Sequence, residues 1–275
     1  MIPALAGLGG LALAAPGLAD AGGWSAGEGA PRPAALLVLS PGLRPEAADP
    51  LARALERAGW DAWRLDLADT DPALAEQVTL PEALAELEAR GRPVLIVGEG
   101  LGGRIAARSA EAGRIHPAGL ALLGAPLDLA TAGDAPVALV QWLAALPVPE
   151  APLDLASLAE ARWQDAPALG LLLGDPLPPL GALSPEWLAA LAADVADGAA
   201  ISLVNADFPV FAAASPSDNL GPPESVRGRV PEGSFLRLGL LNLDPREPDH
   251  AGLLTDPASA RALLRWARPL REAAP

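Results

Sequence analysis

The sequence predicts an α/β protein with a mostly parallel central sheet and helices on both of its faces. Short, continuous apolar runs of Ala, Leu and Val alternate with amphipathic segments of helical length, and Gly or Pro separates them. Continuous apolar runs are typical of strands buried on both faces, and regular strand–helix alternation is typical of βαβ units. The 275 residues, 51% of them hydrophobic, are enough for one large domain with a substantial core.

The expected elements follow one another from residue 34 to residue 270. Strands are expected over 34–40, 61–67, 93–98, 119–124, 209–215 and 234–241, and helices over 46–59, 81–91, 101–113 and 257–270. Between about 125 and 207 the alternation stops, and proline-punctuated helical pieces carry Trp142, Trp163 and Trp187. This region predicts a helical insertion that caps the sheet, with its tryptophans used for packing.

The first 33 residues lie outside the expected sheet. Residues 1–21 are apolar, carry no charge before Asp20, and end in the A-x-A-like triplet Ala19-Asp20-Ala21, which is typical of a signal peptide. No Lys or Arg marks a basic start, so two alternatives stay open: export with cleavage, or a cytoplasmic protein with an apolar N-terminal segment. Residues 22–33 are rich in Gly, Pro and Ala and predict a linker, which leaves 34–271 as a single domain.

Composition excludes several classes of function. A net charge of −15 without any basic run argues against nucleic-acid binding, and no membrane span is expected after residue 21. The chain has no cysteine, and His116 and His250 belong to no metal-binding motif, so neither a metal nor a cofactor is expected. His116 precedes an expected strand and is expected to be inert.

One stretch has the layout of a nucleophile elbow. In PVLIVGEGLGGRIAARSA, residues 93–110, an apolar run breaks at a glycine cluster and continues directly into a helical pattern. The G-x-S-x-G elbow of serine hydrolases has this strand–turn–helix layout, but the serine position is here occupied by Gly100.

Read in order, the chain resembles the α/β-hydrolase fold from about residue 34 to residue 270. LVLSPGL (37–43) resembles the strand and turn of the oxyanion loop, with Pro41 where histidine is common. PVFAAASPSDNLGPPESV (209–226) resembles the loop that presents the catalytic acid, here Asp218, and DHAGLLTDP (249–257) resembles the histidine loop, here His250. The order of elbow, acid and histidine is the order this fold uses.

The resemblance implies a role for each of these positions. Asp218 and His250 would be the inherited acid and base, and Gly100 the nucleophile position without a nucleophile. The N–H groups of Leu101 and of Gly42 or Leu43 would be the oxyanion donors. Because glycine has no side chain, the acyl-enzyme route through Gly100 is closed.

Three hypotheses follow. The first is a catalytically impaired relative of serine esterases, lipases or thioesterases that acts in binding or scaffolding, with the insertion covering a pocket for a small apolar, acyl or ester compound. The second is an active ester or thioester hydrolase with a displaced serine, Ser40 or one of the nearby Ser215 and Ser217; Glu99 points elsewhere on a tight turn.

The third hypothesis is a nucleotide-binding protein. Gly98, Gly100 and Gly103 satisfy G-x-G-x-x-G, but the match lies in the middle of the expected sheet. No carboxylate stands about 20 residues further on, at Leu123 and Gly124, where a dinucleotide fold places one.

Overall fold

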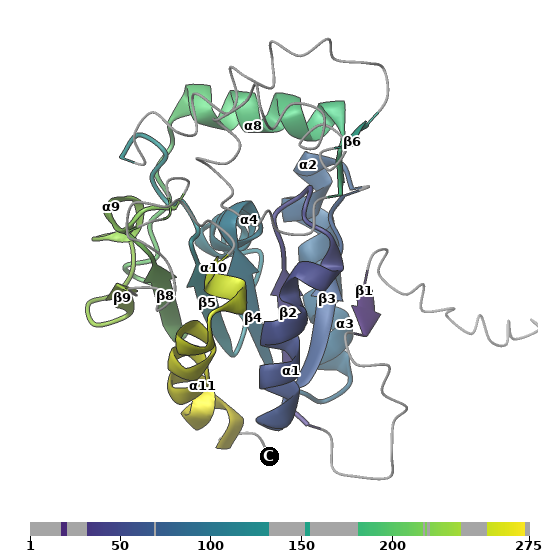
Figure 1. Ribbon diagram of the computed structural model, residues 1–275, viewed down its shortest axis with the longest axis vertical. Coiled ribbons are helices and arrows are strands. Elements are labelled where there is room, and N and C mark those ends of the chain that lie inside the picture. The colour runs from purple at the N-terminus through teal and green to yellow at the C-terminus, as the bar shows by residue number, and fades with distance from the viewer. Residues whose placement is uncertain are drawn as a thin grey trace, which may run out of the picture.

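A computed structural model of the protein describes residues 18–20, 32–68, 70–131, 152–154, 181–216, 218, 221–237 and 252–272. Within these ranges one seven-stranded sheet has the order β1-β3-β2-β4-β5-β8-β9, and helices cover both of its faces (Figure 1). Neighbouring strands from β3 to β9 pair in parallel, and β1 pairs antiparallel with β3. The predicted fold class is confirmed.

The parallel strands lie where the apolar runs predicted them. Their bounds are β2 Ala34–Val38, β3 Asp61–Leu65, β4 Val94–Glu99, β5 Gly119–Leu123, β8 Val210–Ala214 and β9 Phe235–Arg237. Every residue of β2, β4, β5 and β8 is buried, as expected for strands covered on both faces. The last predicted strand, 234–241, extends beyond residue 237 and so partly lies outside the described residues.

The short edge strand β1, Leu18–Asp20, was not predicted. It pairs with β3, with Leu18 opposite Leu65 and Asp20 opposite Trp63. A strand of three residues is too short to show a period of two, and it falls within the segment that resembles a signal peptide. Cleavage after residue 21 would remove this strand from the sheet, and cleavage itself remains a prediction.

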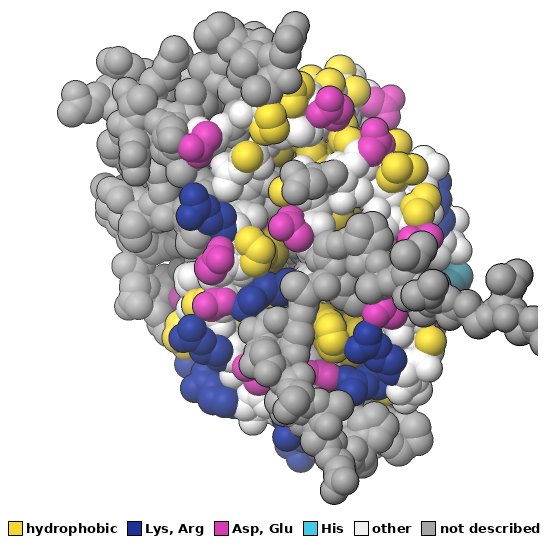
Figure 2. Space-filling model, turned by 90° about the vertical axis from the view of Figure 1, so that its right-hand side faces the viewer, with side chains coloured by type: hydrophobic (Ala, Val, Ile, Leu, Met, Phe, Trp, Pro, Cys, Tyr) yellow, Lys and Arg dark blue, Asp and Glu magenta, His cyan; other side chains and the backbone are white. Residues whose placement is uncertain are grey.

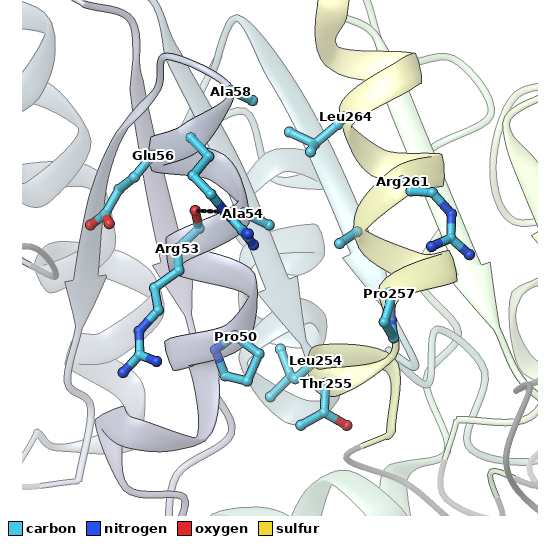
Figure 3. Close-up of a pocket in the computed structure, with 12 residues that line it drawn as sticks. Pro50, Arg53, Ala54, Glu56, Ala58, Leu254, Thr255, Pro257, Arg261 and Leu264 are labelled. Atoms are coloured by element: carbon cyan, nitrogen blue, oxygen red, sulfur yellow. Dashed lines mark hydrogen bonds between the residues drawn. The ribbon is translucent and has the colours of Figure 1, made fainter.

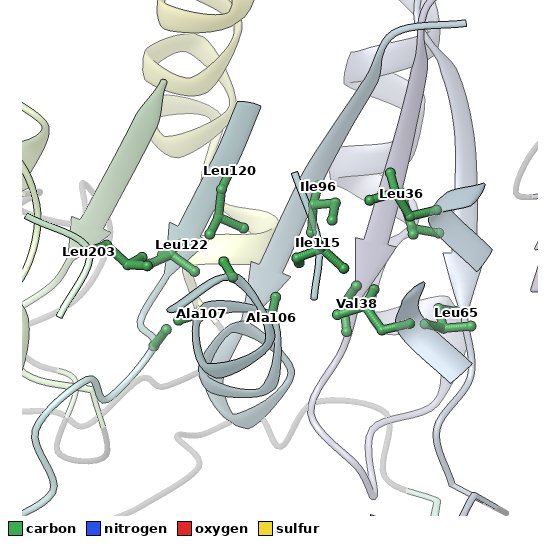
Figure 4. Close-up of a cluster of buried hydrophobic side chains, with 14 of the residues drawn as sticks. Leu36, Val38, Leu65, Ile96, Ala106, Ala107, Ile115, Leu120, Leu122 and Leu203 are labelled. Atoms are coloured by element: carbon green, nitrogen blue, oxygen red, sulfur yellow. The ribbon is translucent and has the colours of Figure 1, made fainter. Parts of the chain in front are cut away.

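The main helices divide between the two faces of the sheet. α1 (Asp49–Arg57), α10 (Gly252–Thr255) and α11 (Pro257–Glu272) pack on one face, and α3 (Leu80–Ala89) and α4 (Gly100–Glu111) pack on the other. Alternate residues of β2 enter the two cores: Leu36 and Val38 lie on the α3–α4 side (Figure 4), and Leu37 on the α1–α11 side. The predicted helices are confirmed to within three residues at each end, with a 3-10 turn, Pro45–Ala48, before α1.

Two further turns of helix were missed. α2 (Pro72–Leu74) continues into a π-helical turn, Ala75–Thr79, that leads to α3. Asp71 caps α2, because its side chain accepts hydrogen bonds from the N–H groups of Ala73 and Leu74. Two more short helices were also missed: α9 (Pro223–Val226), which follows β8, and α10, which precedes α11.

The described part of the insertion is mainly the helix α8, Pro185–Asp197, preceded by the short antiparallel pair β6 (Leu153–Asp154) and β7 (Ala182–Leu183). α8 lies across the end of the sheet where α4 begins (Figure 1). Trp187 anchors it there, since its buried indole donates a hydrogen bond to the carbonyl of Leu67, 2.9 Å away. Trp142 and Trp163 lie outside the described residues.

The acidic chain has a mixed surface. On the face seen in Figure 2, acidic and basic side chains are interspersed, and the basic ones gather in the lower half of the view. None of the helices in the described ranges combines the length and the hydrophobicity that crossing a membrane requires.

Candidate active site

The predicted elbow forms a sharp turn between β4 and α4. β4 ends at Glu99 and α4 begins at Gly100, whose φ of 51° lies in the left-handed region. Glycine adopts this conformation at little cost, whereas other L-residues are strained there. The predicted strand–turn–helix layout of residues 93–110 is confirmed, with Gly100 at its centre.

The other glycines of this stretch allow α4 to lie directly against the sheet. A Cβ on Gly102 would lie 2.4 Å from the carbonyl oxygen of Val38, and a Cβ on Gly98 would lie 2.4 Å from the Cα of Gly103. Both distances are far below a normal van der Waals contact. Two of the three glycines in the G-x-G-x-x-G match, Gly98 and Gly103, are therefore explained by close packing of α4 on β4.

The predicted oxyanion loop is a tight turn over residues 40–43. Leu43 donates its N–H to the carbonyl of Ser40 at 3.0 Å, and Gly42 has a φ of 91°. Proline in the second position and a left-handed glycine in the third are the signature of a type II turn. The carbonyl of Gly42 accepts a hydrogen bond from Gly181 at 2.8 Å, which ties this turn to the insertion.

Ser40 lies against the elbow. Its hydroxyl donates to the carbonyl of Glu99 at 3.2 Å and accepts from the N–H of Leu101 at 2.9 Å, while its own N–H donates to the carboxylate of Glu99 at 3.1 Å. Glu99 is fully buried and Ser40 is 9% exposed. The fold thus joins the ends of β2 and β4 through three hydrogen bonds made by one serine.

Asp218 lies at the end of β8, where the catalytic acid was predicted. It is fully buried, and its carboxylate accepts a hydrogen bond from the N–H of Gly221 at 2.9 Å. A Cβ on Gly124 would lie 2.5 Å from this carboxylate and 3.3 Å from the side chain of Leu253 in α10. Asp218, the end of β5 and the start of α10 therefore meet at one place.

The two histidines are separated in the sequence and only one is described. His250 and the alternative nucleophile Ser217 lie outside the described residues, and His250 precedes the first residue of α10, Gly252, by two positions. His116 is exposed in the segment before β5. The pKa of Glu88 in α3 is raised, because burial raises it by more than the charge of His116 lowers it. Ser215 is buried, and its carbonyl accepts a hydrogen bond from the N–H of Asp218 at 3.1 Å.

Comparison with known proteins shows which fold surrounds these residues. The sequence matches no protein-family profile and no curated protein. Solved structures do match: one of two metagenome-derived lipolytic enzymes has 19% identity and a TM-score of 0.56 over 88% of this chain and 94% of its own. A thermophilic esterase from Thermogutta terrifontis has 16% identity and a TM-score of 0.55 over 87% and 90%.

The chain has the α/β-hydrolase fold. A proline iminopeptidase from Mycobacterium smegmatis matches as well, with 14% identity and a TM-score of 0.54 over 88% of this chain and 91% of its own. At these identities the likeness concerns the fold, and proteins with this fold carry out different reactions.

One feature next to the elbow was not predicted: a buried arginine one turn beyond it. Arg104 is 2% exposed and donates from Nε and Nη2 to the carboxylate of Asp194 in α8, at 2.6 and 2.9 Å. Its guanidinium also donates to three backbone carbonyls, those of Pro126, Leu127 and Ala199. Arg104 stands in GLGGRIAA, among residues small enough to pack closely on a sheet. This position is the sequence signal that could have indicated that its side chain is buried.

The charge of this arginine sets the ionisation of its partner. Burial raises the pKa of Asp194, but hydrogen bonds and charge from Arg104 and Arg108 outweigh this effect and hold the pKa below its ordinary value of 3.8. Asp194 is therefore ionised when folded, and α8 is attached to α4 by a charged pair.

Two hollows among the described residues differ in size and place. Between α4 and α8, a cavity of about 70 Å³ is lined by apolar side chains, including Leu101, Ile105, Trp187 and Leu191, and by the charged Glu76, Arg104, Arg108 and Asp194. A larger open groove of about 850 Å³ runs between α1 and α11 (Figure 3), and none of the predicted site residues within the described ranges lines it. The smaller of these two hollows adjoins the elbow, because Leu101 and Arg104 at the start of α4 line it.

Proposed function

We propose that this protein, related in fold to serine esterases and lipases, does not catalyse acyl transfer and acts by binding a small, apolar ligand. The observation that carries this proposal is Gly100, which stands at the centre of the elbow with the left-handed φ of that turn and no side chain. A serine hydrolase needs a hydroxyl at this point to attack the carbonyl carbon. The supporting geometry of the fold persists around a missing nucleophile.

The hydrogen bonds of Ser40 argue against its use as a displaced nucleophile. Its hydroxyl proton is donated to the carbonyl of Glu99, which cannot act as a base, and its oxygen accepts the N–H of Leu101. Nucleophilic serine instead donates its proton to a histidine or another base. The roles of His250 and Asp218 as inherited base and acid remain predictions from the resemblance.

The ligand is proposed to bind between α8 and the carboxyl end of the sheet. Leu101, Trp187 and Leu191 supply apolar surface there, next to the elbow. Open α/β sheets place their ligands at this end of the strands. The glycines that resemble a nucleotide-binding motif are used in helix packing, so no thermal shift is expected with NAD(P) or a flavin.

Covalent labelling tests the absence of acyl transfer. The wild-type protein is incubated with a fluorophosphonate probe and, separately, with a series of p-nitrophenyl esters of increasing chain length. We expect no labelling and no hydrolysis above the rate without protein. Labelling that Ser40→Ala abolishes, with the fold intact by circular dichroism, would contradict the proposal and support a displaced nucleophile.

A further inference from the structure

Ser40 engages two of the three N–H groups that the resemblance names as oxyanion donors. The N–H of Leu101 donates to its hydroxyl at 2.9 Å, and the N–H of Leu43 donates to its carbonyl at 3.0 Å. Both lengths are normal for hydrogen bonds. This observation is independent of the missing side chain at Gly100, because it concerns the groups that would stabilise an oxyanion.

The Leu101 N–H belongs to the first turn of a helix. α4 begins at Gly100, so this N–H has no acceptor within its own helix. In hydrolases of this fold, the N–H of the residue after the nucleophile is one of the oxyanion donors. Here the Ser40 hydroxyl, held in place by its second bond to the Glu99 carbonyl, occupies the position in front of that donor.

The Leu43 N–H is turned inward by the local sequence. In the turn over residues 40–43, Pro41 has no N–H to offer, and the left-handed Gly42 directs the next N–H back to the carbonyl of Ser40. The Leu43 N–H is therefore bonded within the turn itself.

We infer that Ser40 is an internal occupant of the oxyanion site and closes it to the carbonyl oxygen of an ester or acyl ligand. The inference rests on the proposed function and concerns the same site. Glu99 supports the closure, because its buried carboxylate accepts the N–H of Ser40 and holds the serine against the elbow. Ligands are therefore recognised through apolar contacts, and a nucleophile restored at position 100 faces an oxyanion site that is already filled.

Amide hydrogen exchange measured by NMR tests the occupancy directly. In Ser40→Ala, the Leu101 N–H loses its acceptor and should exchange at least about tenfold faster, whereas the Leu43 N–H keeps its backbone acceptor and should be unchanged. Ser225→Ala is the matched control, since it removes a hydroxyl of another buried serine, one that donates to the carbonyl of Pro222. Equal Leu101 exchange in the wild type and in Ser40→Ala would overturn the inference.

A gain-of-activity series tests the consequence. Gly100→Ser and the double variant Gly100→Ser/Ser40→Ala are compared in hydrolysis of p-nitrophenyl acetate, with folding checked by circular dichroism. Because one oxyanion donor is worth about 100-fold or more in rate, the double variant should be at least about tenfold faster than the single variant. Equal rates, including no hydrolysis by either variant, would count against the inference.

The two proposals fail on different results. Ester hydrolysis or probe labelling by the wild type would overturn the proposed function. An unchanged exchange rate of the Leu101 amide, or equal hydrolysis rates in Gly100→Ser and Gly100→Ser/Ser40→Ala, would overturn the closure by Ser40. Neither result would bear on whether the wild-type protein hydrolyses esters.

Discussion

Two successive turns of α4 are held in place by opposite means. The first turn, with Gly100, Gly102 and Gly103, lies against β2 and β4 because its residues lack side chains. The turn that begins with Arg104, together with Arg108 one turn further on, attaches to α8 through a buried charge and its partner Asp194. The first contact is steric and the second is electrostatic, although they lie within nine residues of one helix.

The two contacts differ in what they contribute to this α/β-hydrolase fold: the glycines give the turn its shape, and the arginine positions a neighbouring helix. The glycine turn reproduces the backbone of an elbow without supplying a reactive group, so its shape is a matter of packing. The arginine is bonded to Asp194 and to backbone carbonyls, and it thereby attaches α8 over the end of the sheet. In the function proposed above, the site keeps its framework without a nucleophile at position 100, and the Leu101 N–H, an expected oxyanion donor, is bonded within the protein.

The largest effect is expected from removing the buried charge. Arg104→Met leaves Asp194 and three backbone carbonyls without their main donor, and should lower the free energy of unfolding by about 3 to 5 kcal/mol. Arg108→Met is the control, because Arg108 is 37% exposed and its pairs with Asp194 and Glu76 should be worth less than about 1 kcal/mol. Urea unfolding followed by circular dichroism measures both. Similar losses in the two variants would contradict the assignment of the α8 attachment to Arg104.

A smaller effect is expected from adding one methyl group to the first turn. Gly102→Ala would place a Cβ 2.4 Å from the carbonyl oxygen of Val38 and should destabilise the protein by about 2 kcal/mol, despite a gain of about 1 kcal/mol in helix propensity. Thermal unfolding gives the sign of the change. A stabilised Gly102→Ala protein would show that α4 does not pack as closely as its glycines allow.

The charged pair also predicts a pH dependence. The folded-state pKa of Asp194 lies below its ordinary value of 3.8, so ionisation of this residue stabilises the fold at pH above that value. The contribution is lost as the pH falls from about 3.8 through the lower folded-state pKa. The stability difference between the wild type and Asp194→Asn should therefore be constant near neutral pH and shrink below about pH 4. A difference that stays constant down to pH 2 would contradict the linkage.

The smallest effect is expected at the elbow itself. Gly100→Ala keeps the turn but places a Cβ at a φ of 51°, which should cost about 1 kcal/mol. Gly113→Ala provides the comparison, since Gly113 has a φ of 67° and nothing within 4 Å of an added Cβ. Equal losses in denaturant unfolding would show that Gly100 is required only for its φ. A much larger loss at Gly100 would reveal a steric constraint as well.

The sequence alone predicted those features that depend on residues close to one another in the chain. Strands such as Val94–Glu99 follow from continuous apolar runs, and the turn at Pro41-Gly42 follows from the conformations that these two residues prefer. The glycine cluster around Gly100 predicted the strand–turn–helix layout for the same reason. The edge strand Leu18–Asp20 escaped because three residues show no period.

The sequence by itself thus determined the order of strands and helices, the shape of the elbow and the absence of a side chain at its centre. The tertiary structure alone decided which groups meet there: Ser40 bonds Leu101 across 61 residues, and Arg104 bonds Asp194 across 90. Local preferences act over a few residues, whereas these contacts depend on strand pairing and helix packing that bring distant segments together. For this reason the sequence could identify the candidate oxyanion donors, and only the fold could show that Ser40 already engages two of them.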